Sequence, residues 1–237
     1  MGYRFDIQEH DVGPNGGTPL RVAFLSDIHR SDWVSKAETE AAAQACRARH
    51  PDVLLLGGDY ISGEKDLPLL EELADTMATV APPLGIYYVL GNHDYWSGAA
   101  EVRAAFDRVG MHDMTNRNTC LDGGLHLCGI DDAWAGRPDV EAAFRGSGER
   151  RLVLMHNPKT FDKISDRGCT AIAGHTHGGQ VRIPFLPNPA SLHDHRYIAG
   201  WFSAGNSRLY VSKGLGKSIV PFRINCPPEI TFLNVKI

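Results

Sequence analysis

The sequence predicts an α/β protein that folds as a single domain, residues 1–237. Short apolar runs typical of buried strands alternate along the chain with longer segments of helical periodicity. Several of the apolar runs end in Gly, Asp, Asn or His, and ligands of α/β sheets bind beyond the carboxyl ends of such strands. The chain has 237 residues, of which 43% are hydrophobic, so it can bury a substantial core, and α/β domains of this size commonly stay single.

The composition excludes several classes of function. The formal net charge of −4 argues against a general nucleic-acid binder, which needs a basic face to neutralise phosphates. The five cysteines are widely spaced and form no CxxC pair, so they indicate reduced thiols rather than a disulfide framework or a thiolate zinc site. No run approaches the ~18 apolar residues of a membrane span. We therefore expect a soluble, cytoplasmic protein, with association at a membrane surface left open.

The first half of the chain predicts three buried strands with helices between them. Tyr3, Phe5 and Ile7 alternate with polar residues, which is typical of an edge strand. Helices are expected where alanines and other good helix formers gather or where apolar residues recur at helical spacing, and they end near Pro82 and Gly110. The expected strands are 21–25, 52–56 and 86–90, and the expected helices are 35–50, 67–80 and 99–109.

The second half continues the alternation and adds two hairpins. Turn residues at 122–124 and at 205–206 predict hairpins within 111–132 and between 196–202 and 207–212. Two further strands are expected at 151–155 and 170–173, short helices at 140–144 and 159–166, and an outer strand of the sheet at 229–235.

Polar residues compatible with metal binding follow the first three predicted strands. Asp27 and His29 are two residues apart, so in extended backbone their side chains leave on the same face. Gly57 and Gly58 allow a close backbone approach while Asp59 projects beyond the strand. The stretch 91–94 places an amide, an imidazole and a carboxylate side by side. Each block taken alone could be ordinary turn or capping chemistry.

Histidines follow the next two strands. His156 ends the run 151–155, where a packed or capping role is the alternative. His175 and His177 lie between glycines, and this is the sharpest metal signal in the chain. Two other groups of polar residues are not interpreted as metal ligands. No strand precedes 193–195, which is interpreted as a surface loop, and the adjacent carboxylates 131–132 are typical of a solvated turn.

The strand-end residues share one kind of donor chemistry. All offer oxygen or imidazole nitrogen, and none offers sulfur, which suits Mn²⁺, Fe²⁺ or Zn²⁺ better than Cu(I), while the histidines argue against Ca²⁺. If Asp59 bridges, two ions can lie about 3.5–4 Å apart, the spacing used for in-line displacement at phosphorus. The set comprises Asp27, His29, Asp59, Asn92, His93, His156, His175 and His177.

The order of these blocks, D-x-H, G-D, G-N-H-D, H and G-H-T-H, resembles the calcineurin-like metallophosphoesterase superfamily. All five blocks occur in sequence order from Asp27 to His177. The stretch 174–180 and the segments 213–216 and 227–229 are similar to the bacterial YkuE/YaeI branch, whose members include phosphodiesterases and a UDP-diacylglucosamine pyrophosphatase. The resemblance implies a four-layer α-β-β-α sandwich of two mixed β-sheets flanked by helices.

The resemblance also implies two divalent cations and their ligands. One ion would be held by Asp27, His29, Asp59 and His177, and the other by Asp59, Asn92, His156 and His175. Asp59 would be shared. Many members of this branch carry a transmembrane or twin-arginine segment before the catalytic domain, and none is found in this sequence.

We expect a dinuclear-metal phosphohydrolase, most simply a phosphodiesterase in which a hydroxide between the ions attacks phosphorus in line. His93 would protonate the leaving group, and Asp94 would orient its imidazole. Arg30 and Arg182, with Arg196, are candidates for contacts to substrate phosphate. The alternatives are a UDP-2,3-diacylglucosamine-type pyrophosphatase acting at the membrane surface and a non-catalytic scaffold. The oligomeric state is not predicted.

Four aromatic residues follow the metal blocks and could form an apolar wall for a base or an acyl chain. Packing in the core is the alternative for each. They are Trp33, Tyr60, Tyr95 and Trp96.

Overall fold

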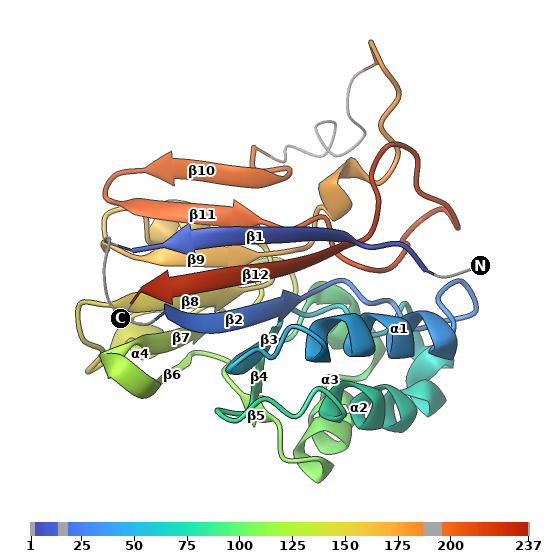
Figure 1. Cartoon of the computed structure of the whole chain (residues 1–237), viewed down its shortest axis with the longest axis horizontal. Coiled ribbons are helices and arrows are strands. Elements are labelled where there is room, and N and C mark those ends of the chain that lie inside the picture. Colours follow the sequence, from blue (N-terminus) through green and yellow to red (C-terminus); the bar gives the residue numbers. More distant parts are fainter. Residues whose placement is uncertain (1–2, 14–18, 187–195, 237) are drawn as a thin grey trace.

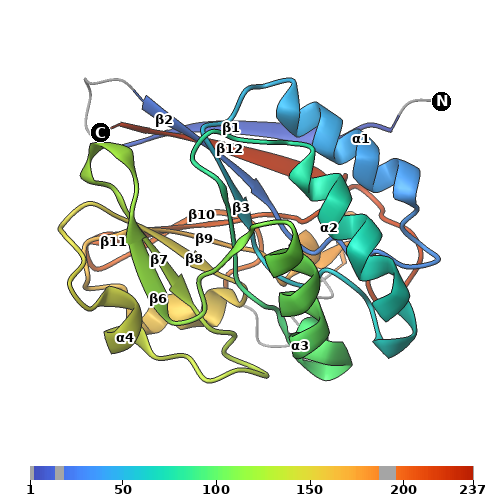
Figure 2. The same ribbon diagram turned by 90° about the horizontal axis from the view of Figure 1, so that it is seen from below.

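The computed structural model describes residues 3–13, 19–186 and 196–236 (Figure 1). Two six-stranded sheets pack against each other, and helices cover their outer faces (Figures 1 and 2). No helix within the described ranges is long and apolar enough to cross a bilayer. The five cysteines are free thiols.

The first sheet is mixed, with four parallel strands at one side. In order it contains β1 (Asp6–Val12), β12 (Glu229–Lys236), β2 (Pro19–Leu25), β3 (Val53–Leu56), β4 (Ile86–Tyr88) and β5 (His112–Asp113). Strands β2 to β5 are parallel, β12 is antiparallel to β2, and β1 is parallel to β12. The prediction that the closing strand is an outer one was wrong. Both faces of β12 are buried, Phe232 beneath the helices and Leu233 between the sheets, so the strand lies inside the sheet and β1 forms the edge.

The second sheet is also mixed and contains both predicted hairpins. Its order is β10 (Gly200–Ala204), β11 (Ser207–Val211), β9 (Thr170–Ala173), β8 (Arg151–Met155), β7 (His126–Ile130) and β6 (Arg117–Cys120). The hairpins β6–β7 and β10–β11 are antiparallel, and β7, β8, β9 and β11 are parallel.

The larger helices cover the first sheet and the smaller ones cover the second. The first group is α1 (Lys36–Arg47), η1 (Glu64–Leu69), α2 (Leu70–Ala78) and α3 (Asn92–Arg108), and the second is α4 (Val140–Phe144) and η3 (Pro158–Lys163); η2 (Asp122–Gly124) and η4 (His177–Gly179) are single turns. A capping box between Ser35 and Glu38 starts α1. The backbone of α3 is not helical at Gly98 (φ 158°, ψ 73°), so the predicted helix 99–109 corresponds to the part of α3 after this kink. The strand-end block 92–94 forms the first turn of the part before it.

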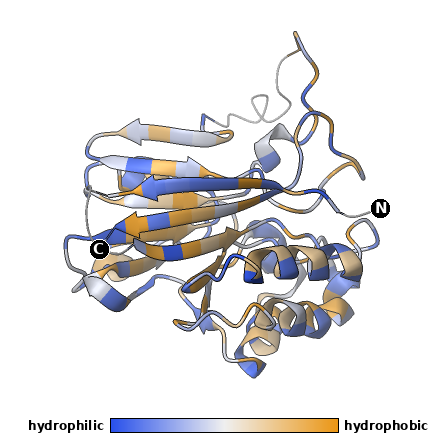
Figure 3. Cartoon of the chain, in the orientation of Figure 1, coloured by the Kyte–Doolittle hydropathy of each residue, from blue (hydrophilic) through white to orange (hydrophobic). Residues whose placement is uncertain are grey.

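Alternate residues of each central strand enter different apolar layers. In β2, Val22 and Phe24 lie between the sheets, whereas Ala23 and Leu25 lie beneath the helices. In β8, Leu154 faces the space between the sheets and Val153 faces α4 and η3. Three apolar layers between four structural layers confirm the predicted α-β-β-α sandwich. Figure 3 shows β1, at the edge of the first sheet, as mostly hydrophilic, whereas its neighbour β12 carries more hydrophobic residues. Each fully buried aliphatic or aromatic side chain contributes roughly 1.5–3 kcal/mol.

The carboxyl ends of the parallel strands of both sheets meet at one edge of the sandwich. The arrows of β2 and β11 point to this same side in Figure 1. The loops after β2, β3, β4, β8 and β9 therefore meet there, although they lie far apart in the sequence. This convergence positions the predicted site.

Candidate metal centre

The loops that carry the candidate ligands have an unusual backbone. Five of the seven predicted ligands have positive φ: Asp27 (52°), His29 (48°), Asp59 (56°), His175 (72°) and His177 (52°). Residues other than glycine adopt this region at a cost of about 1–3 kcal/mol each, and such residues concentrate at functional sites. The backbone conformation at these five residues therefore lowers the stability of the fold, and it directs their side chains toward one region.

The first cluster of donors joins the loop after β2 to the loop after β9. The Nε2 atoms of His29 and His177 are 3.1 Å apart. His29 Nε2 is also 3.6 Å from Asp59 Oδ2, and His177 Nε2 is 3.6 Å from Asp27 Oδ1. Two ligands each about 2.1 Å from one ion lie roughly 3–3.5 Å apart, so these separations fit a shared cation.

The second cluster is centred on His156 after β8. Its Nε2 lies 3.3 Å from Asp59 Oδ2, 3.2 Å from Asn92 Oδ1 and 3.1 Å from His175 Nδ1. These separations also fit ligands of one cation. Asp59 Oδ2 belongs to both clusters, so the two groups of donors meet at a single carboxylate oxygen.

Hydrogen bonds fix how the ligand rings are turned. His156 Nδ1 donates to the carbonyl oxygen of Gly57 at 2.7 Å, which leaves the lone pair on Nε2 facing the second cluster. His29 Nδ1 lies 3.3 Å from Ser62 Oγ, which turns its Nε2 toward the first cluster in the same way. Both carboxylate oxygens of Asp27 accept from the backbone N–H of His175, at 2.9 and 3.0 Å. The two sheets are thereby joined through the ligands themselves.

Glycines make room for these carboxylates. A Cβ atom on Gly91 would overlap Asp59 Oδ1, and one on Gly174 would overlap Asp27 Oδ2. The backbone approaches the ligands so closely that no side chain fits at either position. This explains the glycines that precede Asn92 and His175 in the sequence blocks.

The charges of the buried donors favour a divalent cation. Burial lowers the pKa of His29 to about 3 and that of His177 well below its usual value, so both imidazoles are neutral. Burial raises the pKa of Asp27 to about 6. For Asp59 burial acts in the same direction, but the neighbouring His156 outweighs it and holds the pKa of Asp59 well below its usual range. The same attraction overcomes burial and raises the pKa of His156, so a cation would displace its proton.

His93 lies beside the shared carboxylate. Its backbone N–H donates to Asp59 Oδ1 at 2.9 Å, and its ring centroid is 4.8 Å from that of His29. Its Nδ1 lies 2.9 Å from the carbonyl oxygen of Ser62. Because a carbonyl can only accept, Nδ1 carries the proton and Nε2 carries the lone pair of the neutral ring. A ring nitrogen of His93 lies within 4.8 Å of donor atoms of His29 and Asp59.

The sequence had suggested that Asp94 orients the imidazole of His93, and the structure shows that it does not. Its carboxylate is fully buried and accepts the backbone N–H groups of Gly91, Asp59 and Tyr60, each at 2.8 Å. As the third residue of α3, Asp94 turns its side chain back to cap its own helix. It thereby ties the loop after β3 to the start of α3, while Ser62 takes the expected contact with His93.

The predicted phosphate-binding arginines are occupied by protein acceptors. Arg30 donates to Glu72 and to the carbonyl oxygens of Ser31 and Val34. Arg182 donates to the carbonyl oxygen of Gly178. Arg196 pairs with Asp162 at 3.6 Å.

Arg223 was missed by sequence reasoning. Its Nη2 lies 3.3 Å from His177 Nδ1 and donates to the carbonyl oxygens of Lys213 and Gly214 at 2.9 and 3.2 Å. Its positive charge adds to the lowering of the His177 pKa. The irregular loop 212–228 carries no strand pattern or metal motif, so no signal in the sequence pointed to it.

The proposed apolar wall is only partly present. Tyr60 is fully buried and packs against Tyr88 and Phe106, so the core-packing alternative is correct for it. Trp33 is 44% exposed, but among the described residues its ring contacts none of the histidines of the centre, so it forms no part of such a wall. Trp96 is 57% exposed. Trp96 lies 5.2 Å from the ring of His93.

Asp131 and Asp132 do not form a solvated turn. Both are buried, and they accept backbone N–H groups from their own loop, including those of Trp134 and Arg137. Tyr95 donates its hydroxyl to Asp131 Oδ1 at 2.5 Å. The prediction of a solvated turn was wrong because the backbone N–H groups that stabilise these carboxylates depend on the conformation of the loop, and two adjacent aspartates in a sequence do not reveal that conformation.

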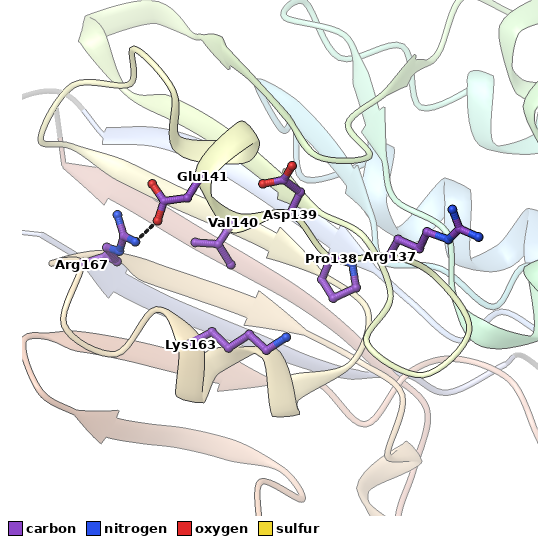
Figure 4. Close-up of a pocket in the computed structure, with 7 residues that line it drawn as sticks. All are labelled: Arg137, Pro138, Asp139, Val140, Glu141, Lys163 and Arg167. Atoms are coloured by element: carbon purple, nitrogen blue, oxygen red, sulfur yellow. Dashed lines mark hydrogen bonds and ion pairs between the residues drawn. The ribbon is translucent and has the colours of Figure 1, made fainter.

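A hollow on the described surface lies apart from the centre. This hollow, of about 610 Å³ between α4 and η3, is bordered by the ion pair of Arg167 and Glu141 and includes no candidate ligand (Figure 4). The loop 193–195, interpreted as a surface loop, lies outside the described residues.

The four-layer sandwich and its two donor clusters around one carboxylate define a metal-dependent enzyme built on an α/β scaffold. Residues 20–179 match the family described as calcineurin-like phosphoesterase, and the chain belongs to this family. It is a metal-dependent phosphoric ester hydrolase.

Known relatives agree with this assignment. The chain is 31% identical over 241 residues to Phosphodiesterase YaeI of Escherichia coli, covering 98% of this chain and 88% of the relative. It is 27% identical to the uncharacterized metallophosphoesterase YkuE of Bacillus subtilis, covering 99% and 86%. Among solved structures, a dimetal phosphatase from Danio rerio shares the fold, with a TM-score of 0.54 and 12% identity over 83% of this chain and 88% of that one. The predicted superfamily and branch are confirmed.

Proposed function

We propose that this protein is a phosphodiesterase that uses two divalent cations, of Mn²⁺, Fe²⁺ or Zn²⁺, within a single domain. The observation that carries the proposal is the position of Asp59 Oδ2, 3.6 Å from His29 Nε2 and 3.3 Å from His156 Nε2. One carboxylate oxygen shared by two sets of oxygen and imidazole donors suits a pair of ions rather than one.

The described donors divide between the two ions as the geometry groups them. Asp27, His29 and His177 would hold one ion and Asn92, His156 and His175 the other, with Asp59 shared. Bound there, the cations would supply an activated water for in-line attack and neutralise charge on the phosphate. Oxygen and imidazole donors without thiolate support the choice of metals.

His93 would act on the leaving group. Because Ser62 holds the Nδ1 proton, Nε2 is the nitrogen that would take up a second proton from solvent and pass it to the leaving oxygen, which would return the ring to its neutral form. The hydrogen bond from the His93 backbone to Asp59 Oδ1 keeps the ring next to the shared ligand. His93 therefore needs no role as a metal ligand.

Two features support a diester rather than a monoester as substrate. The relative YaeI is named a phosphodiesterase. In addition, Arg30, Arg182 and Arg223 all donate to protein acceptors, and a diester with a single negative charge needs less cationic compensation than a monoester dianion. Contact of Arg30 or Arg182 with substrate phosphate stays a prediction, and it would require either side chain to exchange a protein acceptor for the phosphate.

Metal-reconstituted assays test this function. The chelator-treated protein, reloaded with Mn²⁺, Fe²⁺ or Zn²⁺, is expected to take up two ions per chain and to hydrolyse bis-p-nitrophenyl phosphate faster than p-nitrophenyl phosphate. Uptake of two ions without turnover of either ester, or turnover that survives chelation, would contradict the proposal. Turnover of UDP-2,3-diacylglucosamine with no hydrolysis of simple diesters would favour the pyrophosphatase alternative.

A further inference from the structure

Two exposed tryptophans connect the two sides of the metal centre. Trp96 is 57% exposed and Trp134 is 62% exposed. The ring of Trp96 is 5.2 Å from that of His93, the ring of Trp134 is 5.4 Å from that of His175, and the two indoles are 5.3 Å apart. An unbroken series of edge-to-face contacts thus runs from the proposed acid to a candidate ligand of the second ion.

Buried polar groups hold both tryptophans in place. The carboxylate of Asp132 accepts the backbone N–H groups of Trp134 and Ala135, at 2.8 and 2.6 Å. Asp131 accepts the hydroxyl of Tyr95, which precedes Trp96 in α3, so the two elements that carry the tryptophans are tied together. Burying two adjacent carboxylates to fix an exposed loop contributes little to the core, and such rigid exposed aromatics are typical of binding surfaces.

We propose that Trp96 and Trp134 bind a planar ring of the substrate beside the scissile phosphate, and that the substrate is a nucleoside phosphodiester. The inference rests on the proposed function. Indole faces stack on nucleobases without regard to sequence. A base stacked on Trp134 would be separated from the metal centre by the side chain of His175. This separation leaves room for roughly a ribose between the base and a phosphate at the centre. An acyl chain would instead need a concave apolar groove, whereas these two rings are open to solvent.

The chain also offers a matched control for this surface. Trp33 is 44% exposed, and its ring makes no ring contact with the histidines of the centre among the residues that the structure describes. Substituting leucine at Trp33 removes an exposed indole of the same kind without touching the proposed platform.

Two esters that release the same chromophore test the inference. Thymidine 5′-(p-nitrophenyl phosphate) and methyl p-nitrophenyl phosphate differ in the nucleoside, not in the leaving group. The metal-loaded wild type is expected to prefer the thymidine ester. Trp134→Leu is expected to reduce that preference, measured as the ratio of kcat/KM values, by about tenfold through KM. Trp96→Leu is expected to shift the ratio in the same direction, and Trp33→Leu to leave it unchanged.

The possible failures are distinguishable. Equal losses on both esters in Trp134→Leu would mean that the indole only supports His175, and the inference would be overturned. A wild type that hydrolyses both esters equally well would overturn it too. If the metal-loaded wild type hydrolyses neither ester, the proposed phosphodiesterase function itself fails.

Discussion

The two sheets contribute different chemistry to the same site. The loops of the first sheet provide three oxygen donors and one imidazole, from Asp27, Asp59, Asn92 and His29. The loops of the second sheet provide imidazoles alone, from His156, His175 and His177. The negative charge that holds a cation therefore comes from one half of the molecule, and the nitrogen donors that favour transition metals come mainly from the other.

The two halves also differ in how they are braced. In the first, Asp94 ties together the loops after β3 and β4, and the backbone N–H groups of Asp27 and His29 donate to Gly58 and Asp59. In the second, the backbone N–H of His175 donates across to Asp27. The second half also has a backbone bond of its own, from Gly174 to His156, so the first half is distinguished by a buried carboxylate that accepts three backbone N–H groups.

The largest expected effect comes from exchanging the shared carboxylate. Asp59→Asn removes the negative charge common to both clusters, so the chain should lose both ions. We expect kcat/KM for bis-p-nitrophenyl phosphate to fall by more than the ~100-fold typical of residues that only support a ligand. His175→Ala removes one imidazole donor from the second cluster and should leave about one ion per chain. Elemental analysis of both variants after identical reloading gives the comparison.

Equal metal contents in these two variants would contradict the inference that the first sheet supplies the negative charge that both ions need and the second sheet only imidazole donors. Retention of both ions in Asp59→Asn would remove the basis for a shared ligand. Circular dichroism of each metal-free variant controls for loss of the fold.

The next effect concerns chemistry rather than metal binding. His93→Ala is expected to lower kcat by ~100-fold or more while the metal content stays near that of the wild type, because in the proposed arrangement His93 lies beside Asp59 and holds neither ion. The loss should be smaller for substrates with acidic leaving groups, such as p-nitrophenol, than for alkyl esters that need protonation. Undiminished turnover of an alkyl diester by the variant would refute the role of His93 as an acid.

Sequence alone predicted the ligand loops because strand and ligand signals coincide there. An apolar run such as 170–173 indicates a buried strand, and the glycines around His175 and His177 indicate the tight turn that exposes the imidazoles. The convergence of the loops follows from parallel strands ending at one edge. Most strands were predicted for the same reason, since apolar runs are local features, and both hairpins were predicted from the turn residues between their strands.

What could not be predicted depends on contacts between distant residues. Arg223 reaches His177 from an irregular loop, and Ser62 supports His93 through a backbone carbonyl, which leaves no trace in residue type. The place of β12 inside the sheet depends on its pairing with both β1 and β2, and the apolar run itself did not distinguish it from an edge strand. The role of Asp94 was mistaken for a related reason, since adjacency in sequence to His93 suggested a contact that the first turn of α3 prevents.

The smallest expected effect comes from substituting Asp94, whose carboxylate accepts three backbone N–H groups. Asp94→Asn places an amide NH₂ group where a carboxylate oxygen now accepts a backbone N–H, so one buried donor loses its partner. We expect the free energy of unfolding of the metal-free chain, measured by urea denaturation, to fall by about 1–3 kcal/mol. Metal affinity should fall by roughly tenfold, because the loop that aims Asp59 loses a support.

Asp139→Asn is the matched control for this change. Asp139 caps α4 on the second sheet by accepting the backbone N–H of Ala142 at 2.9 Å, and asparagine caps a helix about as well as aspartate. The control should therefore change neither stability nor metal affinity. If Asp94→Asn behaved like this control, Asp94 would be an ordinary helix cap, and the bracing of the first half of the site would have to come from other hydrogen bonds, such as those of the Asp27, His29 and His93 backbone N–H groups.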